Sequence, residues 1–177
     1  LKKINSLKIS RVGTEIEIDL VAVINKSNNA NKFAEAAKKV SSGSHLSIIL
    51  SSTSLENMKA ALATCAEKRP LVHGANSQNC EAMAALAKEK NCPMTVTAPT
   101  LEELADLAEC AKKAGVEEIM LDVSGNNPKE VLQKLTKIRR AALKKNFRTL
   151  GFPMITFVCD DDPFQEISLA STYLVKY

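Results

Sequence analysis

Polar side chains that could carry chemistry follow the short apolar runs of this sequence. His73 and Asp122 are the pair able to act as a general base, because an imidazole held by a carboxylate can take up and return a proton. They stand in two apolar runs, 70–75 and 118–123, and each run ends in small or polar residues, as a buried strand leading into a loop does. Because the second run is two strands further along the predicted sheet, the sequence leaves a direct contact open.

Each member of this pair also has a structural interpretation. His73 fits a hydrogen-bonded loop histidine, and Asp122 fits a carboxylate that accepts backbone N–H groups of the turn at 124–125. The other polar residues after the apolar runs add few groups suited to acid–base work, so residue chemistry alone names no reaction. These residues are Asn25, Ser51, Ser52, Asn76, Thr97, Asn126 and the acidic stretch 160–162.

The acidic stretch suggests a cation at first sight, since hard metal ions take carboxylate oxygens. Its members Asp160, Asp161 and Asp162 are consecutive, however, and consecutive side chains do not readily converge on one ion. Asp162 also precedes Pro163, which is typical of a helix start. Capping and solvation are therefore the favoured interpretation, and no metal site is predicted.

A basic stretch between residues 137 and 148 is a candidate for binding phosphate or an acidic partner. It lies toward the C-terminal end of a predicted helix, where positive charge is favourable in any case. An ordinary solvated face is therefore the favoured interpretation, and the six glycines have neither P-loop nor dinucleotide-binding spacing. The basic residues are Lys137, Arg139, Arg140, Lys144, Lys145 and Arg148.

Composition bounds the class of protein. The 177 residues are 45% hydrophobic, which is enough for one sizeable core, and the net charge of +4 is too mild to indicate nucleic-acid binding. No apolar run reaches the length of a membrane span, and no signal peptide opens the chain. The five cysteines form no C-x-x-C pair, so free thiols in a reducing cytoplasm are expected, without a disulfide framework, a zinc site or an iron–sulfur site.

Strand and helix patterns alternate along the chain and must position these residues. The clearest helix, 101–114, has Thr100 and Glu103 at capping-box spacing and an apolar stripe at helical intervals. A small hairpin is predicted in the lead-in 1–17, and the last helix is expected to turn Ile167, Ala170 and Leu174 inward. The predicted strands are 19–25, 45–50, 70–75, 92–98, 118–123 and 152–158.

Consecutive strand–helix units predict an α/β fold with a parallel sheet. The favoured architecture is a TIM (β/α)8-type barrel over residues 18–177 that is incomplete here, with about six strand–helix units, because a full barrel needs about 250 residues. A doubly wound open sheet is the rival. It is disfavoured because no glycine-rich loop follows the first strand and because the spacing of the units is even.

The order of several segments resembles one family, the large (gamma) subunit of the corrinoid iron–sulfur protein in the acetyl-CoA decarbonylase/synthase system. The resemblance covers nearly the whole chain from about Ile18 and concerns the central barrel of that family. It is specific in aggregate, because no single segment is a catalytic motif. The segments are KRPLVHGA at 68–75, NCPMTVTAP at 91–99, AGVEEIMLD at 114–122, IRRAA at 138–142, LGFP at 150–153, and DDP at 161–163 followed by LAS at 169–171.

The resemblance implies a role in one-carbon metabolism. Proteins of this family carry a methyl group on a corrinoid (cobalamin) cobalt from a methyl-pterin methyltransferase to acetyl-CoA synthase, in the Wood–Ljungdahl pathway or its methanogen counterpart. The implied partners are these two enzymes and a small barrel subunit, with no nucleic acid and no membrane. The family holds a [4Fe–4S] cluster in an N-terminal domain and the corrinoid in a C-terminal domain. This sequence lacks the cysteine cluster and ends before the barrel closes, so neither cofactor is expected within this segment, and no catalytic residue is carried over.

The resulting hypothesis is a barrel scaffold and docking surface, not catalytic by itself. A free-standing pterin-binding barrel methyltransferase and a purely structural interaction module remain alternatives. The residues expected on a face near the corrinoid or a partner are Asn25, His73, Asn76, Thr97, Asp122 and Asn126.

Overall fold

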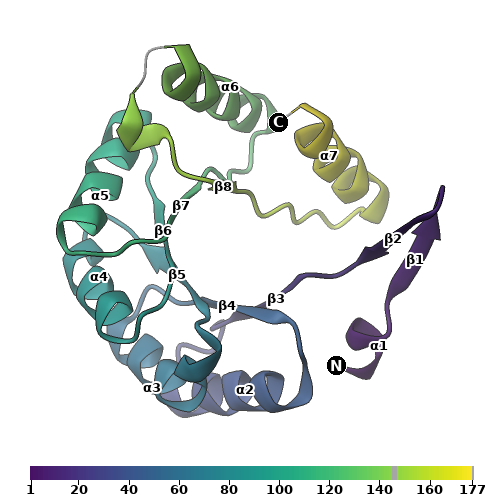
Figure 1. Ribbon diagram of the computed structural model, residues 1–177, viewed down its shortest axis with the longest axis vertical. Helices are drawn as coiled ribbons and strands as arrows, with labels where there is room; N and C mark the ends of the chain where they lie inside the picture. Colours follow the sequence, from purple (N-terminus) through teal and green to yellow (C-terminus); the bar gives the residue numbers. More distant parts are fainter. Residues whose placement is uncertain (145–146, 177) are drawn as a thin grey trace.

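A curled sheet of six parallel strands, in the order β3-β4-β5-β6-β7-β8, is the frame of the molecule (Figure 1). The computed structural model describes residues 1–144 and 147–176. Each strand pairs with the next one along the chain, so the order never reverses as it would in a doubly wound sheet. The strands are β3 (Leu20–Ile24), β4 (Ser47–Ser51), β5 (Leu71–Ala75), β6 (Met94–Thr97), β7 (Ile119–Asp122) and β8 (Met154–Ile155).

Helices cover the outer side of the curl and leave its inner side open (Figure 1). Side chains cap the first turns: Ser54 accepts a hydrogen bond from the N–H of Asn57, and Thr100 accepts one from the N–H of Glu103 at 3.2 Å. This architecture is an α/β half-barrel. The helices are α2 (Ala30–Gly43), α3 (Leu55–Cys65), α4 (Cys80–Glu89), α5 (Leu101–Lys113), α6 (Pro128–Lys144) and α7 (Pro163–Lys176), with short 3-10 turns η1 (Ala66–Lys68) and η2 (Arg148–Leu150).

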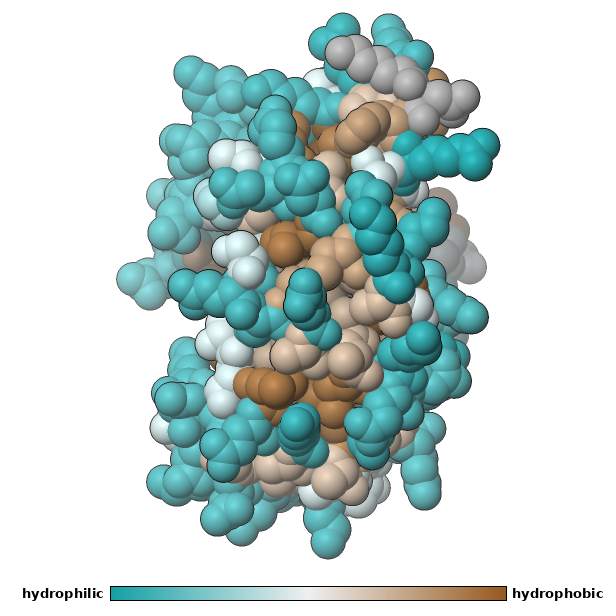
Figure 2. Space-filling model, turned by 90° about the vertical axis from the view of Figure 1, so that its left-hand side faces the viewer, coloured by the Kyte–Doolittle hydropathy of each residue, from teal (hydrophilic) through white to brown (hydrophobic). Residues whose placement is uncertain are grey.

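The core lies between the outer face of the sheet and the helices. Leu50 of β4, Val72 of β5 and Leu121 of β7 point into this layer and are fully buried. Leucine and methionine side chains of α3, α4 and α5 meet them there, as expected for a chain with five Phe, two Tyr and no Trp. Seen from the side that carries α4 and α5, the outer surface shows an apolar band between hydrophilic side chains (Figure 2).

A short lead-in precedes the curled sheet. Helix α1 (Lys2–Asn5) is followed by strands β1 (Lys8–Arg11) and β2 (Thr14–Glu17), which pair antiparallel. Val12 and Gly13 form the turn with φ of 50° and 76°, the left-handed values that a tight two-residue hairpin requires. Across the described residues, no helix combines the length and the apolar character that crossing a membrane requires.

The last strand–helix unit differs from the prediction. The strand expected over 152–158 is reduced to β8, Met154–Ile155, which among residues 1–144 and 147–176 pairs only with β7. The expectation that Ile167 and Leu174 of α7 face inward is wrong, because their exposed fractions are 63% and 81%. Their helical spacing is real, but the described residues supply little that packs against this face.

Candidate functional site

The register of the sheet brings polar residues together at the carboxyl ends of the strands. Successive side chains of a strand point to opposite faces, so the neighbours of buried Leu50, Val72 and Leu121 point to the inner side of the curl. Those neighbours include Ser51, His73 and Asp122. Ser51 is the register partner of His73, and Thr97 is the register partner of Asp122.

The pairing of β5 is irregular next to these polar residues. The pairing of β5 with β6 shifts between Val72 and Ala75, as at a β-bulge. Gly74 lies within this register shift and has φ of +117°, a backbone conformation that residues with a Cβ rarely adopt. A Cβ at this position would lie 2.4 Å from the carbonyl oxygen of Ser52. The site therefore depends on the close approach of the β5 backbone to the end of β4.

His73 is held on both sides by hydrogen bonds. Its Nδ1 lies 2.9 Å from Ser51 Oγ, and its Nε2 lies 2.8 Å from Asp122 Oδ2. The second contact reaches across β6 and settles the question that the sequence leaves open: the two side chains touch. Their exposed fractions are 14% for His73 and 6% for Asp122, so the pair is largely shielded from water.

Asp122 is also bound from a second direction. Its Oδ1 accepts the N–H of Ser124 at 2.8 Å, which is the turn contact expected from the sequence. Burial raises the pKa of Asp122, but the hydrogen bonds from His73 and Ser124 outweigh it and leave the pKa below its usual value. Ser124 Oγ in turn accepts the N–H of Phe157 at 2.7 Å, and the Phe157 ring lies 4.8 Å from the His73 ring, centre to centre.

These contacts define the protonation pattern of the cluster. An ionised Asp122 can only accept, so His73 donates from Nε2. In the neutral imidazole, Nδ1 then accepts the hydroxyl proton of Ser51. Serine, histidine and carboxylate are the groups of a nucleophilic triad, but such a triad also needs free N–H donors for the oxyanion.

The N–H groups beside Ser51 are not free to serve that purpose. The N–H of Asn25 donates to Ser51 O, and the N–H of Ser52 donates to His73 O, both at 3.0 Å. The geometry therefore favours a fixed hydrogen-bonded cluster over an acyl-transfer site.

The other predicted site residues lie around this cluster without joining it. Asn25 donates from Nδ2 to Ser52 Oγ at 3.3 Å, and its Oδ1 is buried without a hydrogen-bond partner in the part of the chain that the structure describes. Asn76 closes the turn before α4, where its Oδ1 accepts the N–H of Gln78. Thr97 is half-buried beside Asp122, and Asn126 is exposed in the loop after β7.

Sequence reasoning missed Phe157 and the hydroxyl of Ser124 as members of the site. Phe157 lies in the irregular segment after β8, so no strand alternation indicates its direction. The available signal was an aromatic residue near the end of a predicted strand, and this signal does not indicate which side chain the ring contacts.

The acidic stretch works as capping. Asp162 Oδ1 accepts the N–H of Phe164 at 3.0 Å, and Asp160 Oδ1 accepts the N–H of Asp162 at 2.9 Å. Within residues 1–144 and 147–176 no group of three or more His, Cys, Asp or Glu side chains is placed to hold a metal ion. Of the predicted basic stretch, Lys145 lies outside the described residues.

Comparisons with known proteins add an independent finding. The family model described as "CO dehydrogenase/acetyl-CoA synthase delta subunit" matches residues 1–177. The corrinoid/iron-sulfur protein large subunit of Moorella thermoacetica is 34% identical over the whole chain, which covers 40% of that relative. The acetyl-CoA decarbonylase/synthase complex gamma subunit of Archaeoglobus fulgidus is 32% identical over 99% of the chain and 40% of the relative. The chain thus spans about two fifths of the length of these relatives.

Proposed function

Since the chain belongs to the family of the CO dehydrogenase/acetyl-CoA synthase delta subunit, we propose that it is the barrel scaffold of a corrinoid iron–sulfur protein. That protein would carry a methyl group from a methyl-pterin methyltransferase to acetyl-CoA synthase. The family match over residues 1–177 carries this proposal, and the relatives named corrinoid/iron-sulfur protein large subunit and decarbonylase/synthase gamma subunit support it. The resemblance read from the sequence is confirmed by the same matches.

The half-barrel is proposed to be part of a (β/α)8 barrel over residues 18–177, with residues 1–17 as its lead-in. The sequential strand order and the helices on the outer side of the curl support this architecture. Strands β3 and β8 each have a free edge in the described residues. Pairing with further strands of the same protein would cover both edges, and the greater length of the relatives leaves room for them.

The described residues do not fit either cofactor of the proposed protein. A [4Fe–4S] cluster takes four thiolates, whereas burial raises the pKa of Cys65 and Cys92, and burial with neighbouring Cys110 raises that of Cys80 to about 12. His73 is not free to ligate cobalt either, because both of its ring nitrogens are hydrogen-bonded. The second histidine, His45, is exposed in the loop before β4, at the other end of the strands from this cluster. The proposal therefore assigns both cofactors to other parts of the protein.

The proposed contribution of this chain is a rigid polar wall at the carboxyl ends of the strands. Methyl transfer from a reactive cobalt requires an encounter shielded from water. Polar side chains already bonded to one another offer such an encounter a surface that needs no rearrangement. The residues proposed to face the corrinoid or a partner, among them the small barrel subunit, are Asn25, His73, Asn76, Thr97, Asp122 and Asn126.

A scaffold is favoured over a free-standing pterin-binding enzyme by the contacts of one residue. A pterin would be recognised by an Asp or Asn at a strand end, a requirement that the exposed Asn126 and the buried Asp122 meet only loosely. Asp122 is the carboxylate of the two. Both of its oxygens already accept hydrogen bonds, one from His73 and one from Ser124.

A bulky substitution tests the proposed wall. Asn126 is exposed in the loop after β7, whereas Glu117 is exposed in the loop before β7, at the opposite end of the barrel. In the native protein, Asn126→Trp is expected to slow methyl transfer between the methyl-pterin methyltransferase and the corrinoid about tenfold, which corresponds to about 1.4 kcal/mol. The matched control Glu117→Trp is expected to leave the rate within about twofold. Equal rates for the two variants would contradict the proposed face.

A further inference from the structure

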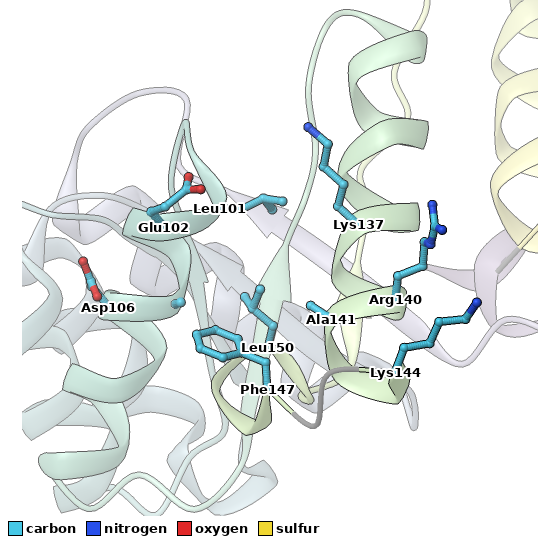
Figure 3. A pocket seen from close by; sticks show the side chains of 10 residues that line it. Leu101, Glu102, Asp106, Lys137, Arg140, Ala141, Lys144, Phe147 and Leu150 are labelled. Atoms are coloured by element: carbon cyan, nitrogen blue, oxygen red, sulfur yellow. The ribbon is translucent and has the colours of Figure 1, made fainter.

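A groove with an apolar floor runs along the outside of the molecule between α5 and α6 (Figure 3). Its volume is about 760 Å³. The turn η2 packs against both helices and separates them, so the two helices do not close over the floor. Phe147 is 47% exposed there. The floor residues are Leu101, Ala105, Ala141, Phe147 and Leu150.

The two walls of this groove carry opposite charges (Figure 3). Lys137, Arg140 and Lys144 lie at spacings of three and four residues and therefore share one side of α6. Glu102 and Asp106, four residues apart, share one side of α5. None of these five side chains makes an ion pair or hydrogen bond within the described part of the chain.

The groove is therefore complementary to a partner with three properties. An apolar stripe would cover the floor and remove Phe147 from water. Negative charge would face Lys137, Arg140 and Lys144, which span about two helical turns, or about 10 Å. Positive charge would face Glu102 and Asp106. A small anion satisfies only the second property, because the carboxylates of α5 repel it.

We propose that the α5–α6 groove binds an amphipathic helix of a partner protein. The helix carries an acidic edge that lies along α6 and a basic edge that lies along α5. Because the two edges differ in sign, the charges also fix the direction in which the helix lies in the groove. This binding site is independent of the methyl-carrier role, since it rests only on the shape and the charges of the groove.

Synthetic helical peptides test this proposal on the native protein. One peptide has a Leu/Phe stripe, Glu on one edge and Lys on the other, and a second keeps the stripe but has Lys on both edges. Fluorescence anisotropy is expected to show the first peptide binding about tenfold more tightly than the second. The variant Lys137→Glu/Arg140→Glu is expected to reverse that preference, and Phe147→Ala to weaken both peptides.

A matched control separates the groove from a general charge effect. Lys38→Glu/Lys39→Glu makes the same change in net charge on exposed positions of α2 and is expected to keep the original preference. Three results would overturn the proposal: no binding of either peptide, an unchanged preference in the Lys137→Glu/Arg140→Glu variant, or self-association of the wild type that this variant abolishes. The last result would assign the groove to a second copy of the chain. None of these results depends on whether the protein holds a corrinoid.

Discussion

The middle and the ends of the curled sheet are built from the same kind of sequence but differ in burial. Strands β4 to β7 have a neighbour on each side, and their helix-facing residues, such as Val72 and Leu121, are 0% exposed. At the ends, the helix-facing Val21 and Val23 of β3 are only half-buried, and Phe164 of α7, the helix after β8, is 83% exposed. Local sequence pattern therefore decides whether a segment is a strand or a helix, whereas the number of packed neighbours decides what that segment contributes to stability.

The largest expected effect compares one leucine from each region. Leu121→Ala removes a fully buried side chain of β7 and is expected to lower the free energy of unfolding by about 3–4 kcal/mol. Leu174→Ala, on the exposed side of α7, is expected to change it by less than about 0.5 kcal/mol. Urea titrations of both variants measure the difference, and similar losses would mean that α7 is packed as tightly as the centre.

Two glycines extend the comparison to the backbone. Gly74 and Gly13 both have positive φ, but only at Gly74 would a Cβ meet another backbone atom, Ser52 O at 2.4 Å. Gly74→Ala is expected to lower the free energy of unfolding by about 3 kcal/mol, through strain and collision together. Gly13→Ala in the lead-in hairpin is expected to cost only the strain, about 1 kcal/mol. Thermal unfolding of the two variants tests this order, and a larger loss for Gly13→Ala would contradict it.

Asp122, the buried carboxylate in the middle of the sheet, should make the free energy of unfolding depend on pH. Because the pKa of Asp122 is lowered in the folded state, its contribution is complete above the unfolded pKa of about 3.9 and is lost as pH falls through the lower folded pKa. At pH 7, Asp122→Asn is expected to lower the free energy of unfolding by about 2 kcal/mol.

This loss of unfolding free energy should be smaller below about pH 4, because Asp122 of the wild type becomes protonated there and no longer makes its contribution. Asp106→Asn, which removes an exposed carboxylate of α5, serves as the control for the loss of one negative charge and is expected to change the free energy of unfolding at pH 7 by less than about 0.5 kcal/mol. Denaturant titrations at pH 7, 5 and 3 measure both variants. A loss that stays constant across this range would contradict the assigned ionisation of Asp122.

The smallest expected effect concerns helix capping. Thr100 caps α5 through its bond to the N–H of Glu103, so Thr100→Ala is expected to cost about 1 kcal/mol. Thr172→Ala, on an exposed position of α7, removes only a bond to the carbonyl of Ser168 one turn earlier and should cost less than about 0.5 kcal/mol. Chemical denaturation resolves the two, and equal costs would show that the α5 cap is not needed once the helix is packed.

The sequence predicted the elements better than their environment. The α5 cap, the alternation of strands and helices, and the turn contact of Asp122 with Ser124 all follow from local signals at Thr100 and after Asp122. The contact between His73 and Asp122 does not, because it depends on the register of three strands and on the irregularity at Gly74. No local pattern encodes that combination.

At the end of the chain, the sequence predicted the helix correctly but its orientation wrongly. Helical spacing correctly placed α7, but the inward orientation inferred from Ile167 and Leu174 assumed a packing surface that the described residues do not provide. Likewise, the apolar residues around Met154 predicted a longer strand than forms, because within the described residues β8 pairs only with β7. Periodicity reports which side of an element is apolar, not what covers that side.

We propose that this chain is the scaffold of a corrinoid iron–sulfur protein. The most direct test is a UV–visible spectrum of the native full-length protein, purified without oxygen and recorded before and after a strong reductant is added. We expect corrinoid bands with an iron–sulfur shoulder, both of which change on reduction. A colourless protein with an unchanged spectrum would contradict this proposal and would favour a free-standing pterin-binding barrel.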